Sequence, residues 1–209
     1  MARSRPVGEN NEEIAERRRR TLIEAAFALV AEKGLEGLRT RDVAARAGVN
    51  ISTLHYYFGT KDDLILALID HVRHAFDAPA RESGPVPESL SEHFALNGRI
   101  FAASPHLAAV LHELMSRAAR DGAARKAFGS VIENWNGIVE TILRHGIKTG
   151  RVRPDVDCHA AARACTSFVI GALTQLGVNA KAFDFARVAG AFEQCVAARP
   201  GESKKAKRK

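Results

Sequence analysis

The sequence predicts an all-α protein in which an N-terminal three-helix domain containing a helix-turn-helix is joined to a larger helical domain. Three observations lead to this fold class. Apolar residues recur at three- and four-residue spacings along most of the chain. Two short amphipathic segments, residues 40–47 and 50–58, flank a glycine turn, and a third segment with its own start signal follows. The chain has 209 residues, 46% of them hydrophobic, which is enough to bury a core in one large or two small domains.

The second expected helix begins at Thr40, whose side chain can cap free backbone N–H groups. Asp42 stands near the positive end of that helix dipole. Val43, Ala44 and Ala47 fall on one face of the helix. Gly48 supplies the backbone freedom that a helix end requires, so a tight turn is expected there.

The third expected helix begins after Asn50, a good N-cap residue, and runs to about Phe58. Leu54 and Phe58 lie one turn apart and are expected to point to the core. Thr60 and Asp63 have the spacing of a capping box that opens the next helix. The apolar positions of that helix are Leu64, Ile65, Leu68, Ile69, Val72 and Phe76.

The outer face of segment 50–58 differs from an ordinary solvated helix face, which normally carries Lys and Glu. It offers small hydroxyls, an imidazole and two phenols, from Ser52, Thr53, His55, Tyr56 and Tyr57. Serine and threonine hydroxyls can bond several base edges, and tyrosine hydroxyls reach phosphate oxygens. This face therefore suits the major groove of DNA, where Lys61 would add a positive charge at the next helix start.

Residues 15–72 resemble the DNA-binding half of the tetracycline-repressor (TetR) family of bacterial transcription regulators. The resemblance lies in Thr40, the Ala-x-x-Ala-Gly-Val turn of residues 44–49, the recognition helix of residues 51–58, and Lys61. It also implies a supporting first helix that ends at Gly34. The residues that would contact DNA are Thr40, Arg41, Asn50, Ile51, Ser52, Thr53, His55, Tyr56, Tyr57 and Lys61.

This resemblance implies a ligand-responsive DNA-binding transcriptional regulator, with repression as the expected direction. Its partners would be a near-palindromic double-stranded DNA operator, a small-molecule effector and a second copy of the chain in a homodimer. One position departs from the family pattern, because His55 stands where a tyrosine usually follows the recognition-helix leucine. A protonated imidazole would add positive charge, so DNA affinity is expected to rise as the pH falls through about 6.5. Comparing His55→Tyr with the wild type at several pH values tests this.

Charge divides the chain into regions. Residues 1–61 carry a net charge of +3, residues 62–198 carry −1, and residues 199–209 carry +5. The nearly neutral middle is expected to pack and to bind something other than phosphate. The organisation expected is a disordered N-terminus (1–11), a helix-turn-helix domain (12–60), a helical ligand-binding and dimerisation domain (61–198) and a basic disordered tail (199–209). The alternative to a solvated, disordered tail is a segment that adds nonspecific DNA affinity.

The second part of the chain is helical in pattern after a loop of residues 79–87. Helices are expected over residues 88–103, from a Ser104 cap with a first-turn Pro105 to a break at Asp121, and around the apolar repeat of residues 128–143. Two more are expected over residues 158–176 and 181–197, where alanines and glycines let helices approach closely. By the family resemblance the last two form a four-helix interface with a second copy. The alternative is that they complete a monomer core.

Two groups of residues in this second part are candidate sites. The proposed dimer interface consists of Phe168, Gly171, Ala172, Val188 and Phe192. The proposed ligand pocket consists of Leu111, His112, Met115, Phe128, Trp135 and Phe168. A single tryptophan in an apolar stripe also fits a core position. Trp135 is therefore expected either to line the ligand pocket or to belong to the core.

Other function classes find little support in the sequence. No apolar run approaches the roughly 20 residues that a membrane span needs, and the polar first residues lack the apolar core of a signal peptide, so a cytoplasmic protein is expected. No phosphate-binding glycine loop, zinc-site spacing or nucleophile motif is present, so we expect no enzyme, cofactor or metal. The alternative to a regulator is a helical protein-interaction module without DNA binding.

Overall fold

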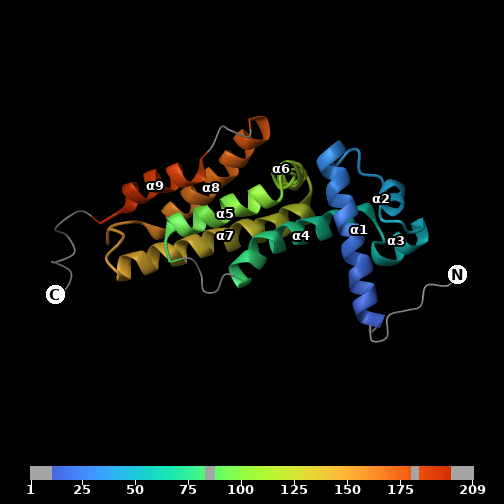
Figure 1. The fold of residues 1–209 in the computed structure, drawn as a ribbon, viewed down its shortest axis with the longest axis horizontal. Coiled ribbons are helices and arrows are strands. Elements are labelled where there is room, and N and C mark those ends of the chain that lie inside the picture. Colours follow the sequence, from blue (N-terminus) through green and yellow to red (C-terminus); the bar gives the residue numbers. More distant parts are fainter. Residues whose placement is uncertain (1–10, 83–87, 180–183, 199–209) are drawn as a thin grey trace. The chain divides into compact units, whose positions relative to one another are not determined.

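The protein is all-α, as the sequence predicts (Figure 1). The computed structural model describes residues 11–82, 88–179 and 184–198, and these form nine α-helices. The chain divides into two compact units between His71 and Val72, inside helix α4 (Lys61–Glu82). The boundary expected after residue 60 coincides instead with the start of α4. The expected disordered N-terminus, except Asn11, and the expected basic tail lie outside the described residues.

The first unit is built from α1 (Asn11–Lys33), α2 (Thr40–Arg46), α3 (Ile51–Tyr57) and the first half of α4. The chain leaves α1 at Gly34, which has a φ of 70°. The apolar faces of the four helices meet in one core, as their sequence spacing predicts. Its most deeply buried members are Leu22, Ala26, Val30, Leu38, Val43, Leu54, Leu64 and Leu68.

The turn between α2 and α3 depends on Gly48. Its φ of 68° lies in the left-handed region, where residues with a Cβ are strained. The start of α2 differs from the expectation that Thr40 caps it. Arg39 occupies the N-cap position without a side-chain capping bond, and Thr40 is the first helical residue. The backbone N–H groups of Asp42 and Val43 both donate to the Arg39 carbonyl. The helix therefore begins one residue earlier than it would with Thr40 as its N-cap.

Helix α4 begins with the capping box that the sequence predicts. The Asp63 carboxylate accepts from the Thr60 backbone N–H (2.9 Å), and the Thr60 hydroxyl oxygen accepts from the Asp63 N–H (3.1 Å). The helix continues to Glu82, so Pro79 lies within it rather than opening a loop. A proline inside a helix removes one backbone N–H and crowds the carbonyl four residues earlier, which is why the sequence favoured a helix end before Pro79. Residues 83–87 lie outside the described part.

The second unit contains the end of α4 and five further helices: α5 (Leu90–Ala103), α6 (Leu107–Ala118), α7 (Gly122–Lys148), α8 (Cys158–Val178) and α9 (Phe185–Val196). Ser89, Asp121, Asp157 and Asp184 cap α5, α7, α8 and α9 with side-chain oxygens. Helix α6 begins two residues later than the Ser104–Pro105 signal predicts, with His106 in the N-cap position. The Ser104 N–H donates to the Ile100 carbonyl, which makes Ser104 the end of α5.

Packing in the second unit places α7 against α6 and α8, while α9 packs along α5 (Figure 1). After α7 the chain turns back, and Val152 lies against Gly146, where a Cβ would collide with it. Val152 forms an antiparallel bridge with Ala197, and the Arg153 N–H donates to the Val196 carbonyl (3.0 Å). These bonds tie the end of α9 to the α7–α8 connection. Among the described helices, none is long and apolar enough to cross a membrane.

Candidate DNA-binding face and ligand cavity

The position of α3 is set by its cap and by two buried side chains. The Asn50 side-chain oxygen accepts from the Thr53 backbone N–H (2.7 Å), as expected for an N-cap. Leu54 is fully buried and Phe58 is 2% exposed, so both anchor the helix to the core. The opposite face of α3 is thereby turned outward.

The outward face of α3 exposes large side chains without a charge. Tyr56 is 83% exposed and Ile51 is 40% exposed, and the described residues contain one other exposed large hydrophobic side chain, Val178. Ser52 and His55 are exposed, while Thr53 and Tyr57 are half-buried. The Tyr56 and Tyr57 rings meet edge to face, with centroids 5.1 Å apart. The five predicted side chains thus form one continuous outer surface of a short helix.

The Thr53 hydroxyl has a defined hydrogen-bonding direction. It donates to the Asn50 side-chain oxygen at 2.9 Å. A hydroxyl has one hydrogen and two lone pairs, so Thr53 retains its lone pairs for an outside donor. Together with its methyl group, Thr53 offers an acceptor and an apolar contact to whatever lies against α3.

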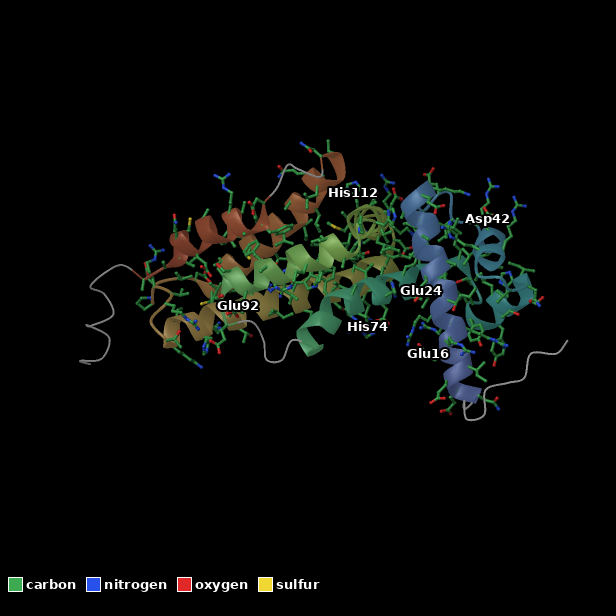
Figure 2. The ribbon with its side chains drawn as sticks, in the orientation of Figure 1. Glu16, Glu24, Asp42, His74, Glu92 and His112 are labelled. Atoms are coloured by element: carbon green, nitrogen blue, oxygen red, sulfur yellow. The ribbon has the colours of Figure 1, made fainter. Side chains whose placement is uncertain are left out.

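The basic residues near α3 have different surroundings. Arg41 is exposed and lies 3.7 Å from the Asp42 carboxylate, which Figure 2 shows on α2. The Lys61 ammonium donates to the Leu35 carbonyl (2.9 Å) and keeps two further N–H donors. Thr40 is half-buried at the start of α2. Lys61 therefore both braces the first unit and carries its charge to the start of α4.

A bidentate ion pair between α1 and α2 was not foreseen from the sequence. The Arg46 guanidinium donates to both Glu32 carboxylate oxygens, at 2.8 and 2.6 Å. These hydrogen bonds raise the pKa of Arg46 above its usual value. The two residues are 14 positions apart, so no local spacing signal reveals the pair. It fixes α2 against the first helix and removes Arg46 from the set of free cations.

A cavity that opens to solvent lies in the second unit, among α4, α5, α7 and α8. The empty space at this place is about 580 Å³ when the open solvent at its mouth is counted. Its apolar wall consists of Phe76, Leu96, Ile100, Ile138, Val169, Leu173 and the indole of Trp135. Its polar members are His93, Asn97 and Thr166. A mainly apolar wall with a few polar groups is typical of a small-molecule site.

Two polar atoms of the cavity-lining residues are shielded from solvent and have no hydrogen-bond partner. They are the indole Nε1 of Trp135 and the hydroxyl oxygen of Thr166, a residue only 5% exposed. A buried polar group without a partner costs about 1–3 kcal/mol. Both atoms belong to residues that line the cavity, so each would gain a partner if its side chain turned toward an acceptor bound there.

His93 and Asn97 form a polar pair one turn apart on α5. The Asn97 amide donates to the His93 carbonyl (2.8 Å) and lies 3.2 Å from the His93 Nε2. Burial lowers the pKa of His93 to about 4. The imidazole is therefore neutral at pH 7 and accepts at Nε2 when Asn97 donates to it.

An aromatic contact connects the cavity to α4. The Phe76 ring lies edge to face against Trp135, with centroids 4.7 Å apart, and against Phe101 at 5.6 Å. The Phe128 ring also lies edge to face with Trp135, with centroids 6.5 Å apart. A molecule that moves Trp135 or enters beside it therefore meets a side chain of α4 directly.

The residues predicted for the pocket are distributed over three places. Trp135 lines the cavity, and the Phe128 ring packs against Trp135. Phe168 packs against Phe94 and Phe192 instead. A separate surface depression contains Leu111, His112 and Met115, and Figure 2 shows His112 on α6. His93, Asn97 and Thr166 were missed, because only the packing of α5 against α7 and α8 turns them to a common space.

The residues predicted for the dimer interface differ in exposure. Gly171 is exposed on α8, while Ala172 beside it is buried within the protomer. Phe168, Val188 and Phe192 are half-buried, and the Phe168 and Phe192 rings lie 5.7 Å apart. Gly171 therefore lies on the outer face of α8, and Ala172 contributes to the core.

Two family matches cover most of the described chain. Residues 22–68 match the family described as bacterial regulatory proteins, tetR family. Residues 99–199 match the family described as BetI-type transcriptional repressor, C-terminal. The first match contains the complete helix-turn-helix. The second contains two of the four helices that form the cavity, α7 and α8, and the end of α5.

Among curated proteins, the fatty acid metabolism regulator protein of Bacillus subtilis (strain 168) is 24% identical over 171 residues, which cover 78% of this chain and 85% of that protein. The HTH-type transcriptional dual regulator CecR of Shigella flexneri is 34% identical over 106 residues. That alignment covers 51% of this chain and 43% of CecR. Sequence similarity is thus extended in one relative and partial in the other.

Solved structures share the fold at low identity. A TetR transcription regulator from Haloarcula marismortui has a TM-score of 0.77 and 21% identity, covering 87% of this chain and 99% of that chain. A transcriptional regulator from Saccharomonospora viridis in complex with choline has a TM-score of 0.73 and 20% identity, with coverages of 88% and 100%. FadR from Bacillus subtilis in complex with stearoyl-CoA has a TM-score of 0.67 and 20% identity, with coverages of 85% and 97%.

Proposed function

The chain belongs to the tetR family of bacterial regulatory proteins and is a DNA-binding transcriptional regulator of the repressor type; from that membership we propose that α3 reads its operator and that the cavity beside Trp135 holds its effector. The observation that carries the first half is the uncharged, exposed face of α3, with Tyr56 83% exposed. A protein that exposes a phenol to this extent on a rigid, capped helix has a surface suited to a partner.

Each residue of the proposed DNA-binding face has a role that its chemistry supports. Thr53 accepts from an exocyclic amine of adenine or cytosine through its lone pairs, since its hydrogen is held by Asn50. Tyr56 and Tyr57 donate to phosphate oxygens, and Lys61 adds a charged phosphate contact. Thr40, Arg41, Asn50, Ile51, Ser52 and His55 complete the contact set.

The active form is a homodimer in this proposal. One recognition helix of this length reads only a few base pairs, whereas two copies roughly 34–36 Å apart read successive major grooves of a near-palindromic site. The exposed outer face of α8 around Gly171 supports a role as the contact between copies, together with Phe168, Val188 and Phe192 of the same region. A protein that binds operator DNA must be in the same compartment as that DNA, so this proposal places the chain in the cytoplasm. None of the relatives named above is described as an enzyme.

The effector acts through α4. This helix begins at Lys61, directly after α3, and at about 1.5 Å per residue its 22 residues extend about 33 Å. Phe76 places α4 in the cavity wall against Trp135. A ligand that displaces Phe76 tilts α4, changes the separation of the two recognition helices and lowers operator affinity.

Selection of bound fragments from genomic DNA tests the DNA-binding half. The recovered fragments should share a near-palindromic site with half-site centres one helical turn apart, or a multiple of it. Lys61→Ala should reduce the salt dependence of operator affinity by about one unit of slope, because one phosphate contact is lost. Lys148→Ala, an exposed lysine at the end of α7, removes the same charge and should leave the slope unchanged.

Thr53 variants test base reading in the same assay. Thr53→Val keeps the shape and removes the lone pairs, so the preferred base should change at one position of each half-site. Thr53→Ser keeps the hydroxyl and should keep that preference. Fragments bound without sequence preference, or no bound DNA at low salt, would favour the alternative of a helical protein-interaction module.

A further inference from the structure

We propose that the effector of this chain is an uncharged, mainly apolar molecule carrying a hydrogen-bond acceptor, such as a ketone or ester oxygen, that pairs with Trp135 and Thr166. This inference rests on the proposed role of the cavity as the effector site. The fold does not choose the ligand, because the two structural neighbours named above hold choline and stearoyl-CoA. The class of ligand must therefore be determined by the side chains in the cavity wall of this chain.

The need for an acceptor follows from the two unpartnered atoms. The Trp135 Nε1 carries a hydrogen and has no acceptor function, so only a lone pair satisfies it. The Thr166 hydroxyl lacks a partner as well, and it can donate to the same kind of group. A pure hydrocarbon would leave both atoms unsatisfied, and a carbonyl oxygen offers two lone pairs.

A negatively charged ligand fits poorly. Among the described residues that line the cavity, none is Asp, Glu, Lys or Arg. His93 is the one titratable group in that wall, and it is neutral at pH 7 because burial lowers its pKa to about 4. A carboxylate or phosphate would lose its water without meeting a positive charge, which is costly in an apolar site.

A positively charged ligand satisfies only part of the wall. The faces of the Phe76 and Trp135 rings can attract a cation. A quaternary ammonium group, however, has no lone pair for the Trp135 N–H or the Thr166 hydroxyl. A neutral molecule with an apolar body and an acceptor oxygen matches the apolar side chains of the wall and the two unpartnered donors, Trp135 and Thr166.

Trp135 makes the test direct, because it is the only tryptophan of the 209 residues. Its fluorescence in the full-length protein is titrated at pH 7.5 with three probes of one chain length: methyl octanoate, sodium octanoate and octyltrimethylammonium bromide. Methyl octanoate should change the emission with a dissociation constant at least tenfold below those of the two ions. An equal or tighter affinity for either ion, or no change with any probe, overturns the inference.

Thr166→Val supplies a second test, since it keeps the side-chain shape and removes the hydroxyl. It should weaken methyl octanoate binding about tenfold, the loss of one buried hydrogen bond. Thr174→Val is the matched control, because the Thr174 hydroxyl is exposed on the same helix and bonds the Ile170 carbonyl. Equal affinities for the wild type and Thr166→Val would contradict the assignment of Thr166.

Operator binding is measured with the same probe to separate the two proposals. Loss of operator affinity with methyl octanoate, at concentrations that change Trp135 emission, supports both. Binding of methyl octanoate with unchanged operator affinity supports the ligand class and contradicts the effector role of the cavity. Loss of operator affinity with sodium octanoate alone supports a regulator and contradicts the uncharged ligand.

Discussion

Single side chains in this protein fall into those that local sequence reveals and those that only packing reveals. Asn50 as a cap and Thr60 with Asp63 as a capping box were predicted correctly, because each acts on backbone groups within three residues. Thr40 has the same residue type as a cap, yet Arg39 holds that position. The place of Thr166 in the cavity wall could not be predicted from the sequence. A threonine within an apolar helix has the same sequence surroundings whether or not it lines a cavity.

His93 should make stability depend on pH. The imidazole binds a proton near pH 6.5 in the unfolded chain but only near pH 4 in the folded one. The unfolded state therefore holds more protons between these values, and stability falls as the pH drops from 6.5 to about 4. The full loss is about 3 kcal/mol, from a pKa difference of about 2.5 units between 6.5 and about 4.

Urea unfolding at pH 7.5 and pH 4.5 measures this effect. The wild type should lose more free energy of unfolding than His93→Gln between the two pH values. Each protein is referenced to its own stability at pH 7.5, so that lost packing cancels. Equal losses in the two proteins would show that His93 does not titrate differently on folding.

Asn50 has two roles that substitution separates. Asn50→Ala removes the cap of α3 and should cost about 1 kcal/mol of stability while weakening operator binding. Asn50→Asp keeps an oxygen for the Thr53 N–H and should preserve stability, since aspartate is an equally good cap. It places a negative charge on the DNA-binding face, so operator affinity should still fall. Unfolding curves and gel shifts on both variants measure the two effects, and intact affinity in Asn50→Asp would exclude Asn50 from the interface.

At the scale of elements, the order and type of the helices followed from apolar periodicity, while several ends did not. Helix α4 extends to Glu82 past Pro79, and α6 starts at Leu107 instead of after Ser104. Residues that could cap a helix occur on either side of the observed helix end. Which of them takes the cap position depends on the backbone hydrogen bonds that the packing of the unit allows. The cavity belongs to this scale too, since α4, α5, α7 and α8 each supply part of its wall.

The turn at Gly48 offers a test of an element junction. Gly48→Ala meets no atom within 4 Å of the new Cβ, so its cost comes from the positive φ alone, about 1–2 kcal/mol. The strain acts where α2 meets α3, and operator affinity should fall with it. Gly137→Ala is the matched control, because Gly137 lies exposed within α7 with open space around it. That variant should gain up to about 1 kcal/mol in thermal or urea unfolding.

For the whole molecule, the sequence predicts a regulator made of two parts. The family matches over residues 22–68 and 99–199 show the regulator family. The charge pattern separates a basic first part from a nearly neutral middle. What sequence could not supply is the face by which two copies meet. The small residues of α8 point both inward and outward, as the buried Ala172 and the exposed Gly171 demonstrate.

A single arginine on α8 tests the dimer. Gly171→Arg adds a side chain into open space in the protomer, because nothing lies within 4 Å of its Cβ position, so the variant should fold with unchanged or higher helix stability. Two copies pressed together at this face would bring two arginines into a close contact and repel each other. Sedimentation should show a monomer, and operator affinity should fall at least tenfold because one recognition helix remains per particle. Gly137→Arg, on the exposed face of α7, should remain a dimer with wild-type affinity. A Gly171→Arg protein that sediments as a dimer and binds the operator normally would place the interface elsewhere.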